Sequence, residues 1–546
     1  MGRPGTAVAP TPPRDPAALQ WLRKHSVAVF LALVLIASGR IVTTYHVFNH
    51  TIDEPFHLAS GMEWLSKGVY KYSTEQPPLS AVAVALGPYL MGVRGYGKAG
   101  IYQEGAAILS ADGHYDRNLT LARLGILPFF WVAATVVYLW ARKYFDEPVP
   151  ALAVLLFTFV PSILAHAGLA TTDMGLTAFT GASFFTGLLW LERPTLPRTL
   201  LFAGAGALAI LAKFSALAFV PCAMIAAYLW FYFVERPARA RILEGVRKAA
   251  PWLGIAIPLV CISIWAAYRF SFGRTPFGNW RLPAPEFFEG IRALAGHNST
   301  GHPAYLFGER SQHGWWYYYF VVLAVKTPLP FLGLLFYGAI LSWRSPSKRG
   351  AYLALAFSAG ILFFSLFSRI NIGVRHILPV YIGFSIVAAV GAARLIEISR
   401  TAKWAGWTAG VLLFWMVATS ALSHPDYIPY FNALAGNEPE KILVDSDLDW
   451  GQDMKRLSKR LREVGAKQVT FDPFIVAYLE AVHGFPPIKP MDPVNPSPGW
   501  NAVSLTELKT TRLGLFDDHP EVQLWPDQIK PTEKVSPGVW LWYFPP

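Results

Sequence analysis

Two carboxylates, Asp53 and Glu54, follow the first hydrophobic segment of the chain and are the first residues whose side chains could take part in catalysis. A charge removed from water is costly unless it is paired or used. A further acid, Glu75, stands in Glu75-Gln76-Pro77-Pro78-Leu79. A carboxylate within hydrogen-bond reach of an acceptor hydroxyl can act as a general base. The alternative for Asp53 is helix capping, because an Asp before a Pro near a helix start is a common N-terminal signal.

Other charged residues stand where hydrophobic segments begin or end. Asp173 precedes an apolar segment, and Arg375-His376 opens another. Lys213 lies at the tip of a tight helical hairpin, whereas Lys326 has apolar residues on both sides. Cations at a membrane surface suit lipid phosphates, Arg in bidentate fashion and Lys as a point charge. Capping by Asp173 and snorkelling of Lys213 to the interface are the structural alternatives.

The elements that must position these residues are membrane spans. The chain has 546 residues, of which 53% are hydrophobic and 15% charged. Stretches of about 17–25 apolar residues can cross the hydrocarbon core as helices. Eleven such spans are predicted, at residues 27–45, 119–141, 149–165, 171–191, 198–212, 214–234, 251–268, 320–343, 350–368, 374–393 and 404–422. The formal net charge of +12 does not indicate nucleic-acid binding, because the basic residues lie in short clusters between these spans.

Basic clusters occupy alternate short loops, which the positive-inside rule assigns to the cytoplasm. The rule predicts a cytoplasmic tail at residues 1–26 and places everything after Ser423 outside. All the candidate site residues then fall at or near the outer face. Residues 27–422 would form the transmembrane domain, with long external loops at 46–118 and 269–314. Within the first loop, the segment from Leu79 to Met91 predicts a helix lying along the interface.

Residues 423–546 have the composition of an ordinary soluble domain and predict a small α/β module. Strands are expected at 442–444, 468–471, 503–505 and 539–543, with a basic amphipathic helix at 452–464. The acidic run Asp445, Asp447, Asp449 lacks the Gly and the distal Glu of a calcium loop. We expect an auxiliary module that shapes the acceptor side and carries no catalytic residue.

Carboxylates beside fixed cations at one membrane face outline a reaction in which an acceptor hydroxyl is activated and a phosphate leaving group is stabilised. The ordered set Asp53-Glu54, Glu75-Gln76-Pro77-Pro78-Leu79 and Thr172-Asp173-Met174 resembles the GT-C fold glycosyltransferases of glycosyltransferase family 39. That family includes protein O-mannosyltransferases and aminoarabinose transferases. The resemblance covers roughly residues 27–422, and Gln76 departs from the Lys typical of the aminoarabinose branch.

The resemblance implies an enzyme of the plasma (inner) membrane that transfers a sugar, with inversion, from a polyprenyl-phosphate donor to a hydroxyl on the extracytoplasmic face. The acceptor would be a protein, lipid or glycan. Asp53 would be the general base, Glu54 would support its orientation, and Asp173 would complete the acidic site. Substrate-binding residues are expected among His57, Glu75, Lys213, Lys326, Arg375 and His376. The spacing of the histidines fits no metal-ligand motif, but Asp53 and Asp173 could hold a divalent cation through oxygen, so metal dependence stays open.

A transporter or flippase of lipid-linked sugars is the alternative from another class, and a scaffold presenting the C-terminal module is a third. Transporters commonly show internal repeats and charges near the midplane. Neither feature is visible in this sequence, and the polar residues gather at one face. The discriminating observation is whether Asp53 and Asp173 share one outward cavity with Arg375 or Lys326.

Overall fold

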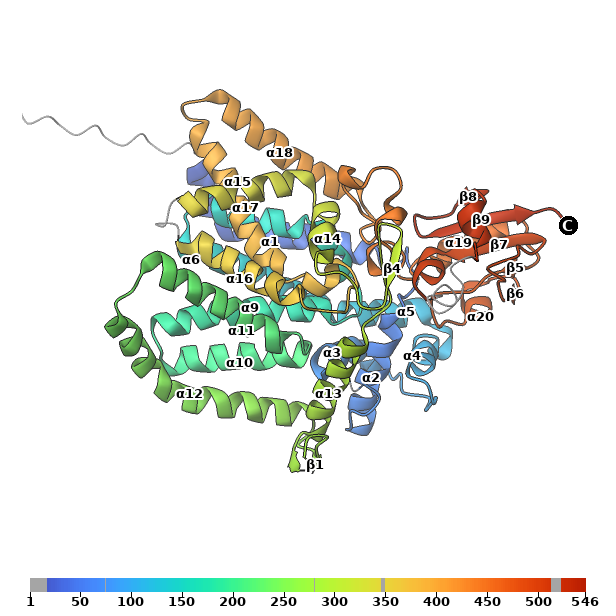
Figure 1. The fold of residues 1–546 in the computed structure, drawn as a ribbon, viewed down its shortest axis with the longest axis horizontal. Coiled ribbons are helices and arrows are strands. Elements are labelled where there is room, and N and C mark those ends of the chain that lie inside the picture. Colours follow the sequence, from blue (N-terminus) through green and yellow to red (C-terminus); the bar gives the residue numbers. More distant parts are fainter. Residues whose placement is uncertain (1–16, 74, 279, 345–348, 512–521) are drawn as a thin grey trace, which may run out of the picture.

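The protein is a helical bundle with a smaller domain at one end (Figure 1). A computed structural model describes residues 17–73, 75–278, 280–344, 349–511 and 522–546, so most of the expected cytoplasmic tail lies outside the described residues. The bundle helices are α1 (Ala17–Thr43), α6 (Leu127–Tyr144), α7 (Val149–Thr158), α8 (Pro161–Ala167), α9 (Asp173–Glu192), α10 (Leu196–Ala212), α11 (Ala216–Trp230), α12 (Arg239–Ala267), α14 (Tyr318–Lys326), α15 (Leu329–Arg344), α16 (Arg349–Ser365), α17 (Val380–Ile398) and α18 (Lys403–Leu422). The first helix therefore starts before residue 27.

The bundle is that of an integral, multi-pass membrane protein. Within the described residues, seven helices are long and apolar enough to cross a membrane, or nine if each bent pair counts as one span. These nine fall on nine of the predicted spans. The other two predicted spans, 198–212 and 350–368, coincide with the shorter apolar helices α10 and α16. The count of eleven stays a prediction.

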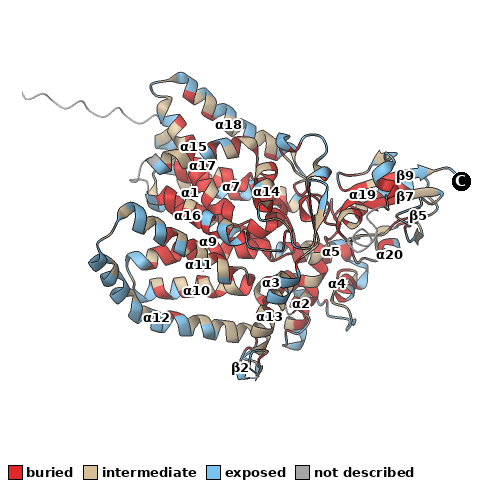
Figure 2. Ribbon diagram, viewed as in Figure 1, coloured by how far each residue is buried: buried red, intermediate tan, exposed pale blue. Residues whose placement is uncertain are grey.

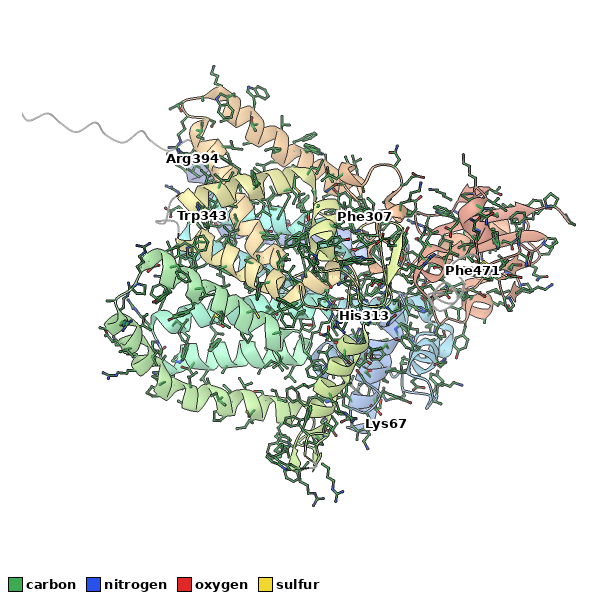
Figure 3. The ribbon with its side chains drawn as sticks, in the orientation of Figure 1. Lys67, Phe307, His313, Trp343, Arg394 and Phe471 are labelled. Atoms are coloured by element: carbon green, nitrogen blue, oxygen red, sulfur yellow. The ribbon has the colours of Figure 1, made fainter. Side chains whose placement is uncertain are left out.

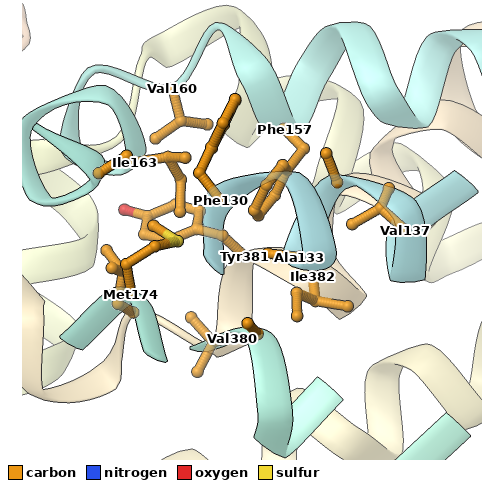
Figure 4. Packing of buried hydrophobic residues seen from close by; sticks show 14 of the residues in the cluster. Phe130, Ala133, Val137, Phe157, Val160, Ile163, Met174, Val380, Tyr381 and Ile382 are labelled. Atoms are coloured by element: carbon orange, nitrogen blue, oxygen red, sulfur yellow. The ribbon is translucent and has the colours of Figure 1, made fainter. Parts of the chain in front are cut away.

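The distribution of burial indicates which helices face lipid. In α9, 83% of the most apolar window is buried, whereas in the more apolar α12 the buried share is 6% (Figure 2). A helix whose exposed side chains are apolar needs an apolar environment, which the lipid provides. The interior packs aromatic and branched side chains such as Phe130, Phe157, Tyr381 and Ile382 (Figure 4).

Two predicted spans are broken rather than straight. Helices α7 and α8 meet at 64°, and α14 and α15 meet at 117°. Proline explains both breaks, because the residue before a proline is pushed out of the helical region. Val160 precedes Pro161, and Thr327 precedes Pro328 with φ −98° and ψ 133°. The predicted continuous helix at 320–343 is therefore wrong, and the break leaves Lys326 at the end of α14.

The predicted external elements gather at one end of the bundle (Figure 1). They are α2 (Asp53–Lys67), α3 (Pro78–Leu90), α4 (Ile101–Leu109), α5 (Tyr115–Leu124), β1 (Phe272–Arg274), β2 (Arg281–Pro283), α13 (Pro285–Thr300), β3 (Ala304–Leu306) and β4 (Glu309–Ser311). Lys67 and His313 lie at this end, and Arg394 and Trp343 lie at the other (Figure 3).

Two glycines allow α2 to pack closely between its neighbours. A Cβ at Gly61 would lie 1.9 Å from the carbonyl oxygen of Ala81 in α3. A Cβ at Gly105 of α4 would lie 2.0 Å from the carbonyl oxygen of Pro55. The segment predicted to lie along the interface is thus a helix, α3, and it is docked against α2.

The C-terminal domain is built on a five-stranded mixed sheet in the order β6-β5-β7-β9-β8. Strand β5 (Val469–Thr470) is parallel to β6 (Ile488–Lys489) and β7 (Gly499–Ser504), whereas β9 (Val539–Phe544) is antiparallel to β7 and β8 (Glu533–Lys534). Helices α19 (Met454–Glu463), α20 (Leu479–His483) and α22 (Trp525–Gln528) accompany it. The predicted strand at 442–444 is wrong, because this segment lies between the 3-10 turns η5 (Pro439–Lys441) and η6 (Asp445–Asp447).

Candidate active site

A cavity of about 180 Å³ opens at the end of the bundle where the predicted external elements gather. Its walls come from α2, α4, the α10–α11 hairpin, α13 and the chain before α17. The lining residues are Asp53, Phe56, His57, Glu75, Gln76, Tyr102, Thr172, Lys213, Phe214, Ser215, Leu294, His297, His302, Ile370, Ile372, Arg375 and His376. A larger cleft of about 620 Å³ lies between α5 and the C-terminal domain, but its charged lining is mainly basic. In the smaller cavity, acid and base groups from several separate elements converge.

The central contact in the cavity is an ion pair between Asp53 and Arg375. Nη1 of Arg375 donates to Oδ2 of Asp53 over 2.6 Å, and the two side chains are 10% and 26% exposed, respectively. Asp53 is the first residue of α2, and the N-cap of that helix, Ile52, makes no side-chain capping bond. Arg375 sits in the 3-10 turn η3 (Val374–Ile377). Burial alone would lower the pKa of Arg375, but the nearby carboxylates, Asp53 first, raise it, so the guanidinium stays charged.

A second ion pair lies behind the cavity wall. Nζ of Lys213 donates to Oδ1 of Asp173 over 2.6 Å, and the Asp173 side chain is buried. Lys213 and Thr172 line the cavity, whereas Asp173 is screened from it by them. Asp173 therefore fixes the position of the Lys213 ammonium group from the buried side of the cavity wall. The N-cap Thr172 makes no side-chain capping bond. Besides the ion pair, Asp173 Oδ2 accepts from Thr171 Oγ1 over 3.3 Å.

Glu54 points away from the cavity and is fully buried. Its Oε1 accepts from Arg123 Nε at 2.8 Å and from the Ala170 amide at 2.9 Å. Its Oε2 accepts from Arg123 Nη2 at 2.9 Å and from the Thr51 amide at 2.8 Å. Burial by itself raises the pKa of Glu54, but Arg123 and the amide donors hold it below its usual value. Glu54 thus anchors the start of α2 to the bundle, and any influence on Asp53 passes through the backbone.

Two neutral histidines line the cavity. Burial lowers the pKa of His57 to about 4 and that of His376 to about 3. Nδ1 of each ring is buried and has no hydrogen-bond partner among the described residues. A buried polar atom without a partner in a cavity wall is typical of a site that receives a ligand. On the opposite wall, Glu75 lies 3.7 Å from His297 Nδ1, and His297 contacts His302 at 3.2 Å.

Lys326 is not in this cavity. Its amine donates to the carbonyl oxygens of Ile428, at 2.7 Å, and Asp447, at 2.6 Å, and it lies 4.0 Å from the Asp447 carboxylate. The side chain is 1% exposed. The structure therefore places Lys326 at the contact between α14 and the C-terminal domain, away from the predicted phosphate-binding position.

The predicted acids are already paired with basic side chains. Asp53 and Asp173 each contact a cation at 2.6 Å, so a divalent ion held by them would have to displace Arg375 or Lys213. Across the described ranges, no group of three or more His, Cys, Asp or Glu side chains is arranged to hold a metal ion.

Sequence reasoning missed several residues of the site and its surroundings. Arg123 falls inside a predicted span, where an intramembrane charge is a signal for a buried partner. Tyr102 comes from α4 and His302 from the loop between α13 and β3, and no sequence pattern in those segments marks them. Trp450 contacts Arg375 from the C-terminal domain, with the guanidinium carbon 4.1 Å from the ring centroid.

Comparisons with known proteins agree with this architecture. Residues 117–268 match the family model described as dolichyl-phosphate-mannose-protein mannosyltransferase. ArnT from Cupriavidus metallidurans, in the apo state, is 14% identical, with 96% of this chain and 98% of that chain covered and a TM-score of 0.50. The apo oligosaccharyltransferase from Archaeoglobus fulgidus is 13% identical, with 89% and 70% covered and a TM-score of 0.46. The chain matches none of the curated protein sequences with which it was compared.

The likeness to ArnT extends over nearly the whole of both chains and establishes the fold. The protein is a polytopic membrane protein of the GT-C fold, as the resemblance to glycosyltransferase family 39 implies. The family model covers the segment that contains α6 to α12, including Asp173 and Lys213.

Proposed function

We propose that this protein is a membrane glycosyltransferase that transfers a sugar, with inversion, from a polyprenyl-phosphate donor to an acceptor hydroxyl. The observation that carries the proposal is the shared cavity of Asp53, Arg375 and Lys213 at the external end of the bundle. A transporter would be expected to have its polar groups near the membrane midplane. Here these polar groups lie at one end of the bundle, so the arrangement does not favour a transporter. The family model, named for enzymes that use dolichyl-phosphate mannose, supports a polyprenyl-phosphate donor.

In this proposal Asp53 is the general base. It takes the proton of the acceptor hydroxyl as the acceptor oxygen attacks the anomeric carbon of the donor. The bond between that carbon and the phosphate oxygen breaks, and its electron pair leaves with the polyprenyl phosphate. Arg375 and Lys213 stabilise the phosphate charge. Without donor, Arg375 is bound to Asp53, so a phosphate that draws Arg375 away also frees the base.

A second pocket, separate from the cavity, offers room for the isoprenoid chain. A groove of about 280 Å³ runs between α10, α11 and α12, and apart from Ser183 its lining is apolar. Its residues Ile210, Ala216 and Leu217 are close in sequence to Lys213 and Ser215 of the cavity. A donor whose phosphate contacts Lys213 would have its tail beside this groove.

We further propose that the N-terminus is cytoplasmic, that the C-terminal domain at 423–546 is extracytoplasmic and that the protein resides in the inner membrane. The charge bias of the short loops supports the orientation.

The test is transfer by the purified protein in lipid vesicles. A panel of polyprenyl-phosphate sugars is supplied with membrane lipids, glycans or peptides as acceptors, and release of free polyprenyl phosphate is measured. Asp53→Asn keeps the side-chain shape and should reduce turnover by about 10²–10⁴-fold. Asp116→Asn, an acid on the same external loop but outside the cavity, is the matched control. Near-normal release by Asp53→Asn would refute the role of Asp53, and no release by the wild type with any sugar would refute the function.

A further inference from the structure

Trp450 of the C-terminal domain contacts Arg375 and the residue immediately before Asp53. Its ring faces the guanidinium of Arg375, with the carbon of that group 4.1 Å from the ring centroid. Its carbonyl oxygen accepts from the amide of Ile52, 3.2 Å away, immediately before Asp53. The side chain is 0% exposed and packs with the core of the transmembrane bundle rather than with the core of the sheet.

The chain on either side of Trp450 holds the segment that leads into Asp53. Asn49 Nδ2 donates to the carbonyl oxygen of Gly451 over 2.7 Å, and Asn49 Oδ1 accepts from the Met454 amide over 2.7 Å. All three residues are buried. The start of α2 is therefore attached to the C-terminal domain at residues 49 and 52.

The same stretch holds the segment that leads into Arg375. Ser446 Oγ donates to the carbonyl oxygen of Ile372 over 2.5 Å, and Asp447 Oδ1 accepts from the Val374 amide over 3.1 Å. Gly373 lies between them with φ +88°, and a Cβ there would be 2.7 Å from Asp447 Oδ2. This close approach and the left-handed backbone together require glycine.

We infer that Trp450 is a positioning residue that sets the geometry of the Asp53–Arg375 pair, and that residues 446–454 form the support that holds the two segments carrying this pair. An aromatic face within reach of a guanidinium attracts the cation and restricts its plane, most strongly where water is excluded. A guanidinium held against this ring keeps its orientation when donor phosphate replaces Asp53 as its partner. The catalytic part of the inference rests on the proposed function, whereas the positioning part is measurable without it.

The experiment compares two replacements of similar size. Trp450→Phe keeps an aromatic face, and Trp450→Leu removes it, while both leave a cavity and the same backbone carbonyl. A displacement on the ångström scale at reacting groups can cost about 10²-fold in rate. We expect Trp450→Leu to lose about that much in kcat with a smaller change in KM, and Trp450→Phe to recover most of it. Trp542→Phe, in the core of the sheet, is the control and should transfer sugar as the wild type does.

Hydrogen–deuterium exchange gives the readout that does not depend on activity. Peptides spanning 49–57 and 371–378 should exchange faster in Trp450→Leu than in Trp450→Phe, with the sheet unchanged. Equal kcat and equal exchange in the two Trp450 variants would overturn the inference while leaving the proposed function intact. If the wild type transfers no sugar, the proposed function fails, and the exchange comparison still decides whether Trp450 positions the pair.

Discussion

Replacing Glu54 by Gln removes one negative charge from a site that has no access to water. The carboxylate accepts from five donors, of which Arg123 supplies two, the Ala170 amide one, and the amide and hydroxyl of Thr51 the others. Both oxygens of Glu54 are used, because Oε1 accepts from Arg123 and Ala170 while Oε2 accepts from Arg123 and Thr51. Whichever way a Gln amide is turned, its NH₂ group faces at least two hydrogen-bond donors. Because NH₂ cannot accept, those hydrogen bonds are lost.

The magnitude follows from the burial of the pair. The Glu54 and Arg123 side chains are each 1% exposed, so Arg123 would keep its charge without a counter-ion. Breaking a buried ion pair from one side typically costs about 3–5 kcal/mol. Asp53, one residue earlier, is 26% exposed, so Asp53→Asn should cost much less stability. Of the two adjacent acids, Glu54 is thus expected to contribute to stability and Asp53 to catalysis.

The assay is denaturant unfolding in detergent, followed by tryptophan fluorescence, together with carrier-phosphate release by the folded fraction. We expect Glu54→Gln to lower the free energy of unfolding, and the double variant Glu54→Gln/Arg123→Met to recover part of the loss because no charge is then stranded. The pKa of Glu54 is lower in the folded protein than its usual value of 4.5, so the stability that its carboxylate contributes is complete above that pH and is lost as pH falls below it. A Glu54→Gln variant as stable as the wild type but inactive would refute the reasoning.

Three further predictions can be measured independently. Reporter fusions after Lys248 and after Ser423 should report opposite compartments, and matching reports would contradict the proposed topology. Arg375→Gln should weaken binding of polyprenyl phosphate by about 1.5–3 kcal/mol, the worth of a hydrogen bond to a charged group, whereas Lys326→Gln should leave that affinity unchanged and lower stability. The pKa of His57 falls from 6.5 to about 4 on folding, so the unfolded chain binds an extra proton between these values and stability declines as pH falls through them. His57→Gln should reduce that slope by up to about 1.4 kcal/mol per pH unit, and an unaltered slope would show that His57 is not buried in its neutral form.

Several conclusions needed no tertiary structure. Apolar length and loop charge are local properties, so they predict a multi-pass membrane protein and place its polar residues at one end of the bundle. The carboxylate at Asp53 and the cations at Lys213 and Arg375 stand out for the same reason, because each interrupts or borders an apolar segment. The helix break at Thr327-Pro328 could also have been predicted from the sequence, because a proline restricts the backbone of the residue before it.

The partners of these charges could be assigned only from the fold. Asp53 and Arg375 are 322 residues apart in sequence, and Glu54 and Arg123 are 69 apart. No periodicity relates such positions, so the sequence could not distinguish Arg375, which lines the cavity, from Lys326, which is buried against carbonyl oxygens. Nor could it show that neighbouring acids face opposite ways, because side-chain direction depends on the packing of α2 between α3 and α4. Trp450 joins the site for the same physical reason: contacts between distant segments are decided by how the bundle and the C-terminal domain pack together.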